Sequence, residues 1–99
     1  MNFAVRYTTG AREDLIRLYE FLLDRDLALA ERALEIIQHG VGMLEQFPFS
    51  CRKAEAKGPF LRELIIPFGS SGYVVLFEIE NETTVTILAL RHQREDDYL

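Results

Sequence analysis

The chain has little of what stabilises secreted, metal-bound or membrane-spanning proteins. Its 99 residues include one cysteine, Cys51, and two histidines. A single cysteine excludes an internal disulfide and is typical of a reducing compartment, and so few Cys and His residues exclude a structural zinc site. No apolar run approaches the ~18 residues of a membrane span, and charges from Arg6 onward interrupt any signal peptide. We therefore expect a cytoplasmic protein without a membrane or metal association.

Positive charge is scarce as well. Lys and Arg number 11 against 16 Asp and Glu, which gives a net charge of −5. This argues against a general nucleic-acid binder, whose binding surface is usually basic. Between Arg52 and Arg62, however, four basic residues stand against one acidic residue, so a local positive patch near the predicted sheet remains open.

Recognisable catalytic motifs are missing too. The sequence contains no P-loop, no glycine-rich dinucleotide fingerprint, no metal-binding helix motif and no nucleophile elbow. We therefore expect no cofactor, and motifs alone indicate only a small α+β domain.

What is present is a strong β-hairpin signal near the C-terminus. Residues 73–79 and 84–90 are alternating, β-branched-rich runs that flank a polar turn. Period-two alternation places Val74 and Leu76 on one face and Tyr73, Val75 and Phe77 on the other. Because both faces carry apolar side chains, the chain's own helices are expected to cover one, and the other is left for a partner.

The preceding residues predict the remaining elements. Strands are expected at 2–8 and 60–66, and amphipathic helices at 10–23 and 27–47, the second closed by Pro48. Thr8 or Thr9 and Asp26 are the expected helix caps, and Gly40 and Gly42 indicate close packing against the first helix. The order of elements predicts an α+β fold, a β-α-α-β-β-β chain with a helical hairpin on one face of an antiparallel sheet. The length suits one domain, residues 1–99.

His92 is the strongest candidate for chemistry. It lies at the end of the last strand beside Arg91 and Arg94, where an imidazole can act as general acid or base and the cations can stabilise an anion. Tyr98 reaches the same place if the tail folds back. The alternative is a solvated histidine in a charged tail. Arg62, among apolar neighbours, either pairs with a carboxylate or binds phosphate.

Several segments together resemble a known family. They are residues 11–15 after the opening strand, 30–34, 44–48, 61–64, 72–79 and 87–95. In order and spacing they resemble ParE-type toxins of the RelE/ParE superfamily, found in toxin–antitoxin and plasmid-stabilisation operons. The resemblance spans nearly the whole chain and implies the β-α-α-β-β-β fold. It also implies a cognate, ParD-like antitoxin whose C-terminal segment wraps the toxin.

The resemblance implies two alternative activities. RelE-like members cut messenger RNA on the ribosome, and ParE-like members inhibit DNA gyrase without established catalytic residues. The charge of −5 favours the gyrase inhibitor over a nuclease that binds a phosphate-rich target. In the ribonuclease alternative, His92, Arg62 and Tyr98 are the catalytic candidates. A third interpretation is an inactive module that only binds its antitoxin.

The partner-binding face is predicted from the same pattern. Its candidates are Leu64, Val74, Leu76, Leu88, Arg91 and Arg94. Apolar anchors are expected to provide the contact, through a helix in a groove or an added strand, and an acidic partner segment is not required. The pattern does not fix which sheet face the helices cover, and the opposite choice exchanges some of these residues for their neighbours. Both a homodimer and a toxin–antitoxin heterotetramer fit the resemblance.

Overall fold

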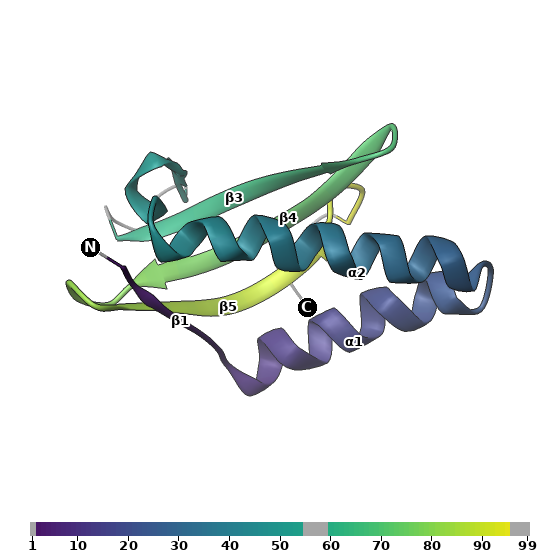
Figure 1. The fold of residues 1–99 in the computed structure, drawn as a ribbon, viewed down its shortest axis with the longest axis horizontal. Helices are drawn as coiled ribbons and strands as arrows, with labels where there is room; N and C mark the ends of the chain where they lie inside the picture. The colour runs from purple at the N-terminus through teal and green to yellow at the C-terminus, as the bar shows by residue number, and fades with distance from the viewer. Residues whose placement is uncertain (1, 55–59, 96–99) are drawn as a thin grey trace.

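The computed structural model describes residues 2–54 and 60–95, which form one sheet with a helical hairpin against it (Figure 1). The elements in chain order are β1 (Ala4–Tyr7), α1 (Thr9–Leu23), α2 (Leu27–Gly42), the 3-10 turns η1 (Met43–Glu45) and η2 (Pro48–Ser50), β2 (Arg52–Lys53), β3 (Leu61–Phe68), β4 (Ser71–Ile79) and β5 (Thr84–His92). This arrangement confirms the predicted α+β fold.

Both helices begin at the predicted caps. The Thr8 hydroxyl accepts the amide of Ala11 at 3.0 Å, and the Asp26 carboxylate accepts the amide of Leu29 at 3.2 Å. The end of α2 differs from the prediction, because the regular helix stops at Gly42 rather than continuing to residue 47. Glycine is a poor helix former, and the chain tightens there into η1.

The sheet has the strand order β1-β5-β4-β3-β2. Strands β2 to β5 pair antiparallel, but β1 pairs parallel with β5, so the sheet is mixed rather than wholly antiparallel. The helical hairpin supplies the long crossover that a parallel pair needs. Strand β3 runs through Pro67 to Phe68, beyond the predicted end at residue 66. Proline is tolerated there because β2 pairs only with Arg62 and Glu63, which leaves the rest of β3 at the sheet edge within the described chain.

A bulge in β5 decides which side chains reach the core. Leu76 pairs with Ala89 and Phe77 with Ile87, so Leu88 is an extra residue. The strand's alternation is reset there. As a result Ile87 and Leu90 both pack in the core on the helix side, although regular alternation would put residues three apart on opposite faces.

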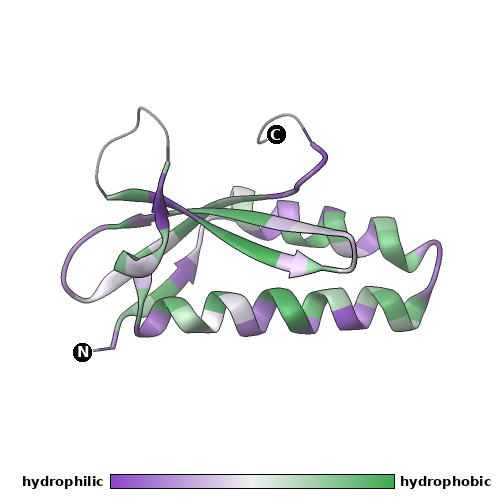
Figure 2. Cartoon of the chain, turned by 90° about the horizontal axis from the view of Figure 1, so that it is seen from above, coloured by the Kyte–Doolittle hydropathy of each residue, from purple (hydrophilic) through white to green (hydrophobic). Residues whose placement is uncertain are grey.

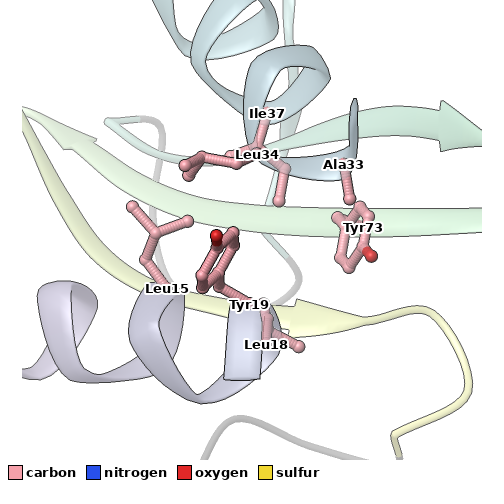
Figure 3. A pocket seen from close by; sticks show the side chains of 7 residues that line it. All are labelled: Leu15, Leu18, Tyr19, Ala33, Leu34, Ile37 and Tyr73. Carbon is pink, nitrogen blue, oxygen red and sulfur yellow. The ribbon is translucent and has the colours of Figure 1, made fainter. Parts of the chain in front are cut away.

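The core lies between the helices and the sheet. Its largest fully buried side chains are Phe77, Ile37, Leu44, Ile87 and Leu90. One small void remains between α1, α2 and β4 (Figure 3). Its volume of about 10 Å³ is room for roughly one water, so it is not a substrate site. It is lined by Leu15, Leu18, Tyr19, Ala33, Leu34, Ile37 and Tyr73.

The two glycines of α2 have different surroundings. A Cβ on Gly40 would come within 2.8 Å of Ile66 Cδ1, so the predicted close packing exists, but against β3 rather than α1. A Cβ on Gly42 would meet nothing within 4 Å. Only Gly40 therefore allows a close approach of α2 to the sheet.

Apolar residues are distributed along the helices and strands as expected for a helical hairpin packed on one face of a sheet. Figure 2 shows hydrophobic and hydrophilic residues interspersed along both helices, and long hydrophobic stretches in the strands. Within the residues described, neither helix is long and apolar enough to cross a membrane.

Candidate functional site

A groove runs between the helical hairpin, the β3–β4 turn and the C-terminal end of β5, with a volume of about 870 Å³. Such a volume lies in the upper part of the usual range for binding clefts, roughly 300–1,000 Å³. The lining residues come from every one of these elements. They are Arg17, Leu18, Phe21, Leu22, Leu29, Arg32, Ile36, Pro67, Phe68, Gly69, Ser70, Ser71, Tyr73, His92, Arg94 and Glu95.

The lining of this groove is largely apolar. Leu22 comes from α1, Ile36 from α2, and Phe68 and Tyr73 from the β3–β4 hairpin. The two rings pack against each other with centroids 5.9 Å apart. Phe21 at the rim is 58% exposed. The groove thus presents partly covered aromatic and aliphatic surface that a partner's side chains could bury.

Charged groups rim this apolar surface. Arg17, Arg32 and Arg94 line the groove, and Glu95 is the only carboxylate among the lining residues that the structure describes. The groove is therefore locally cationic although the whole chain carries −5. In the described part of the chain, the guanidinium groups of Arg32 and Arg94 make no hydrogen bond or ion pair.

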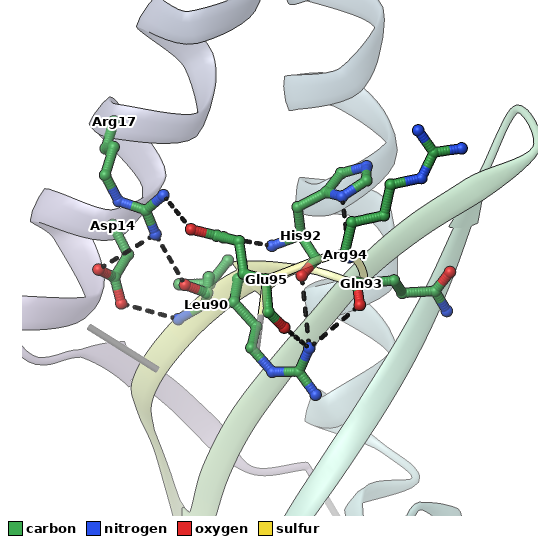
Figure 4. Close-up of polar contacts among 8 residues, drawn as sticks. Asp14, Arg17, Leu90, His92, Gln93, Arg94 and Glu95 are labelled. Atoms are coloured by element: carbon green, nitrogen blue, oxygen red, sulfur yellow. Dashed lines mark hydrogen bonds and ion pairs between the residues drawn. The ribbon is translucent and has the colours of Figure 1, made fainter. Parts of the chain in front are cut away.

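Beyond the last residue of β1 that pairs with β5, two side chains of α1 form hydrogen bonds to the backbone of β5 instead (Figure 4). The register of β1 and β5 ends at Tyr7. Further along β5, the Leu90 amide donates to Asp14 Oδ2 at 3.0 Å, and Arg17 Nη2 donates to the Leu90 carbonyl at 3.4 Å. The buried backbone of Leu90 is thereby satisfied by the helix instead of by a strand.

The same arginine holds the residues that follow β5. Arg17 Nη1 lies 2.8 Å from Glu95 Oε2, and Glu95 Oε1 accepts the His92 amide at 2.7 Å (Figure 4). Arg91 Nη1 donates to the Glu95 carbonyl at 2.9 Å. Residues 92–95 are therefore fixed against α1, and this places Arg94 at the groove.

Both ring nitrogens of His92 have partners. The Arg94 amide donates to Nδ1 at 3.1 Å, so Nδ1 is an acceptor and Nε2 carries the proton in the neutral ring. Nε2 lies 3.0 Å from Ser71 Oγ and donates to it. The serine is thus an acceptor rather than a nucleophile activated by a base. The ring also packs edge-on against Tyr73, 5.5 Å between centroids.

Two of the predicted catalytic candidates, Arg62 and His92, lie apart in the sheet. Arg62 pairs with Phe77 and His92 with Tyr73, so four residues of β4 separate them, roughly 13 Å along the strand. Tyr98 lies outside the described residues. Arg62 Nη1 donates to the backbone carbonyls of Phe49 at 3.1 Å and of Cys51 at 2.8 Å.

The predicted partner-binding residues are also dispersed. Leu64 packs against the core on the helix side, so it does not share a face with Val74 and Leu76, which alternate with the helix-side residues of β4. Val74 is only 2% exposed. Leu88 is the bulge residue, and Arg91 binds backbone carbonyls of the tail. Arg94 is the one member that lines the groove.

Burial shifts the pKa of two weakly acidic side chains, one in the groove and one beside Arg62. It raises the pKa of the Tyr73 phenol in the groove and that of the Cys51 thiol above their ordinary values, although Arg62 acts in the opposite direction on Cys51. Both groups therefore stay protonated at neutral pH, and Cys51 is not an activated nucleophile. Among the described residues, no cluster of three or more His, Cys, Asp or Glu side chains could hold a metal ion.

Sequence reasoning missed most of the groove. Phe21, Leu29, Arg17 and Arg32 line the groove but were not among the candidate residues named from the sequence. The sequence did carry a signal for the groove: each helix has apolar side chains beside its core-facing apolar stripe, at the ends where the two helices meet. It gains meaning only once the β3–β4 turn is known to lie across them.

Comparisons with known proteins agree with this fold. The family described as "ParE toxin of type II toxin-antitoxin system, parDE" matches residues 5–97. "Toxin RelE1" of Caulobacter vibrioides is 32% identical over 79 residues, 80% of this chain and 82% of that protein. "Toxin RelE3" of the same organism is 34% identical over 85 residues, 86% and 88% of the two chains.

A solved structure shows the same arrangement of elements. A chain of the "Chromosomal ParDE TA system from P. aeruginosa" superimposes with a TM-score of 0.74 at 19% identity, covering 91% of this chain and 95% of that one. This likeness concerns the fold alone. Because the family match extends over nearly the whole sequence, the chain belongs to the ParE toxins of type II toxin–antitoxin systems, within the RelE/ParE superfamily.

Proposed function

We propose that this toxin is neutralised by a cognate, ParD-like antitoxin that places a segment in the groove, and that its target is DNA gyrase. The groove is the observation that supports binding of an antitoxin segment. The groove has a volume of about 870 Å³ and a largely apolar lining. The elements that form it are held in position by the core. An amphipathic helix or an extended segment with apolar anchors suits such a surface. A disordered antitoxin segment could wrap further and order on binding.

Charge and site geometry support gyrase inhibition over nucleic-acid cleavage. A net charge of −5 opposes binding to a phosphate-rich substrate. Both ring nitrogens of His92 already make hydrogen bonds, and Arg62 lies at a different part of the sheet. We therefore propose an inhibitor that acts by binding rather than by catalysis, in the bacterial cytoplasm where gyrase works.

Ribosome-dependent cleavage of messenger RNA is the second candidate. The two curated relatives carry the name RelE, and RelE-like members of the superfamily are expected to cut mRNA. In this alternative His92, Arg62 and Tyr98 carry the reaction. Replacing His92 by Ala would then lower the cleavage rate by roughly 10²–10⁴, whereas inhibition of gyrase would need no titratable group at this position.

The two candidates are separated by assaying them in parallel. The purified chain, free of antitoxin, is added to a DNA gyrase supercoiling reaction and to a translating ribosome with a defined mRNA. We expect loss of supercoiling with intact mRNA. Cut mRNA with normal supercoiling would replace the gyrase proposal by the ribonuclease. Inactivity in both assays would leave an antitoxin-binding module, the third interpretation.

A further inference from the structure

The groove carries a charge opposite to that of the molecule around it. Among the described residues that line it, three arginines, Arg17, Arg32 and Arg94, face one carboxylate, that of Glu95, in a chain of net charge −5. We propose that the groove selects a partner segment that bears carboxylates beside its apolar anchors, and that these three arginines bind them. This inference rests on the proposed function, because the antitoxin is the occupant.

Arg17 shows that this wall can bind a carboxylate. Its Nη1 lies 2.8 Å from Glu95 Oε2, and Asp14 Oδ1 is 3.7 Å from its Nη2. The side chain remains 35% exposed and lines the groove. A planar guanidinium has five donors and can bind more than one acceptor. Glu95 thus occupies, within the chain, the kind of contact that a partner carboxylate would make.

Arg32 and Arg94 provide the complementary contacts. They come from different walls, α2 and the turn after β5, and line the groove with guanidinium groups that have no partner among the described residues. The contacts that fix residues 92–95 also fix the backbone of Arg94, whose amide donates to His92 Nδ1. A segment lying in the groove would therefore meet a cation from either side.

The charge pattern also favours the groove as the place where an acidic segment binds. The net charge of −5 repels such a segment from the molecule as a whole, whereas the arginines at the rim of the groove attract it. Complementary charges of this kind determine register and association rate more than raw affinity. The sequence alone suggested that an acidic partner segment is not required. The clustering of arginines from α1, α2 and the tail at one groove reverses that expectation.

The test is binding of the antitoxin encoded beside this toxin, measured by calorimetry with the full-length chains. Arg32→Glu and Arg94→Glu are the test variants. Each replaces a groove attraction by a repulsion and should weaken binding about tenfold, since exposed pairs contribute a few-fold each. Arg12→Glu on the exposed part of α1 is the matched control, because it makes the same charge change outside the groove lining.

Two further measurements complete the test. An antitoxin whose C-terminal Asp and Glu residues are replaced by Asn and Gln should bind wild type and Arg32→Glu with similar affinity. Raising salt from about 0.1 M to about 1 M shortens the Debye length from ~10 to ~3 Å. This should weaken the complex of the wild-type toxin more than the complex of the Arg32→Glu variant.

The outcomes separate the two proposals. Binding that is tenfold weaker in the groove variants and unchanged in Arg12→Glu supports the inference. Equal binding by all variants overturns the inference and leaves the antitoxin proposal standing. No binding of the antitoxin to wild-type toxin overturns both. Thermal unfolding of each variant is measured alongside, and an unchanged Tm excludes loss of fold as the cause.

Discussion

Replacing Asp14 by Ala should destabilise the protein strongly although Asp14 lies on a helix and belongs to neither strand nor apolar core. Asp14 is 7% exposed, and its carboxylate accepts the amide of Leu90, a residue with no exposed surface, at 3.0 Å. Alanine would leave this amide without a partner. An unsatisfied buried donor costs about 1–3 kcal/mol, and a hydrogen bond to a charged group contributes about 1.5–3 kcal/mol. We expect a loss of about 2 kcal/mol, roughly 10 °C in Tm for a chain of this size.

Two variants control for charge and helix propensity. Asp14→Asn keeps an acceptor oxygen and loses only the attraction to Arg17 across 3.7 Å, so it should cost less than about 1 kcal/mol. Glu13→Ala removes an exposed neighbouring carboxylate and should change stability by at most ~0.5 kcal/mol. Urea unfolding followed by circular dichroism measures all three. An Asp14→Ala protein within ~0.5 kcal/mol of wild type would refute the reasoning.

Three further predictions follow from the packing and the buried acids. Gly72→Ala should cost at least ~2 kcal/mol in urea unfolding, because its Cβ would clash with the backbone carbonyl oxygen of Ile66, and an unchanged midpoint would contradict this contact. Gly42→Ala should raise stability by about 0.5–1 kcal/mol, since the added methyl meets nothing and the helix loses a glycine; a lower Tm would count against it. Burial raises the pKa of Tyr7 and Tyr73, so unfolded phenols ionise first and stability should be full below about pH 10 and fall above it. Replacing both tyrosines by Phe should flatten that decline in chemical unfolding measured across alkaline pH.

Local signals in the sequence were sufficient for most of the fold. The period of the apolar residues located both helices and the β4–β5 hairpin, and Thr8 and Asp26 were identified as caps because capping involves neighbouring residues only. The parallel pairing of β1 with β5 was missed, since Val5 and Val85 are far apart in the chain and no short-range pattern records their contact. The bulge at Leu88 was missed for a similar reason, because it depends on the register with β4.

The functional residues were harder to predict because they depend on tertiary contacts. Arg17 lies outside the apolar stripe of α1, and it acquires its contacts only when the end of β5 arrives beside it. His92 was placed correctly at the end of the last strand, but its hydrogen bond to Ser71 requires the pairing of β4 with β5. Leu64 was assigned to a partner face because alternation alone does not show which face the helices cover.

The most direct test of the account is titration of the cognate antitoxin into a gyrase supercoiling reaction inhibited by this toxin. Wild type, Arg32→Glu and Arg12→Glu toxins are compared at equal concentration. We expect equal inhibition by all three, and about tenfold more antitoxin to restore supercoiling with Arg32→Glu than with the other two. Normal supercoiling in the presence of wild-type toxin would contradict the proposed target, and equal rescue of all three would contradict the role of the groove charge.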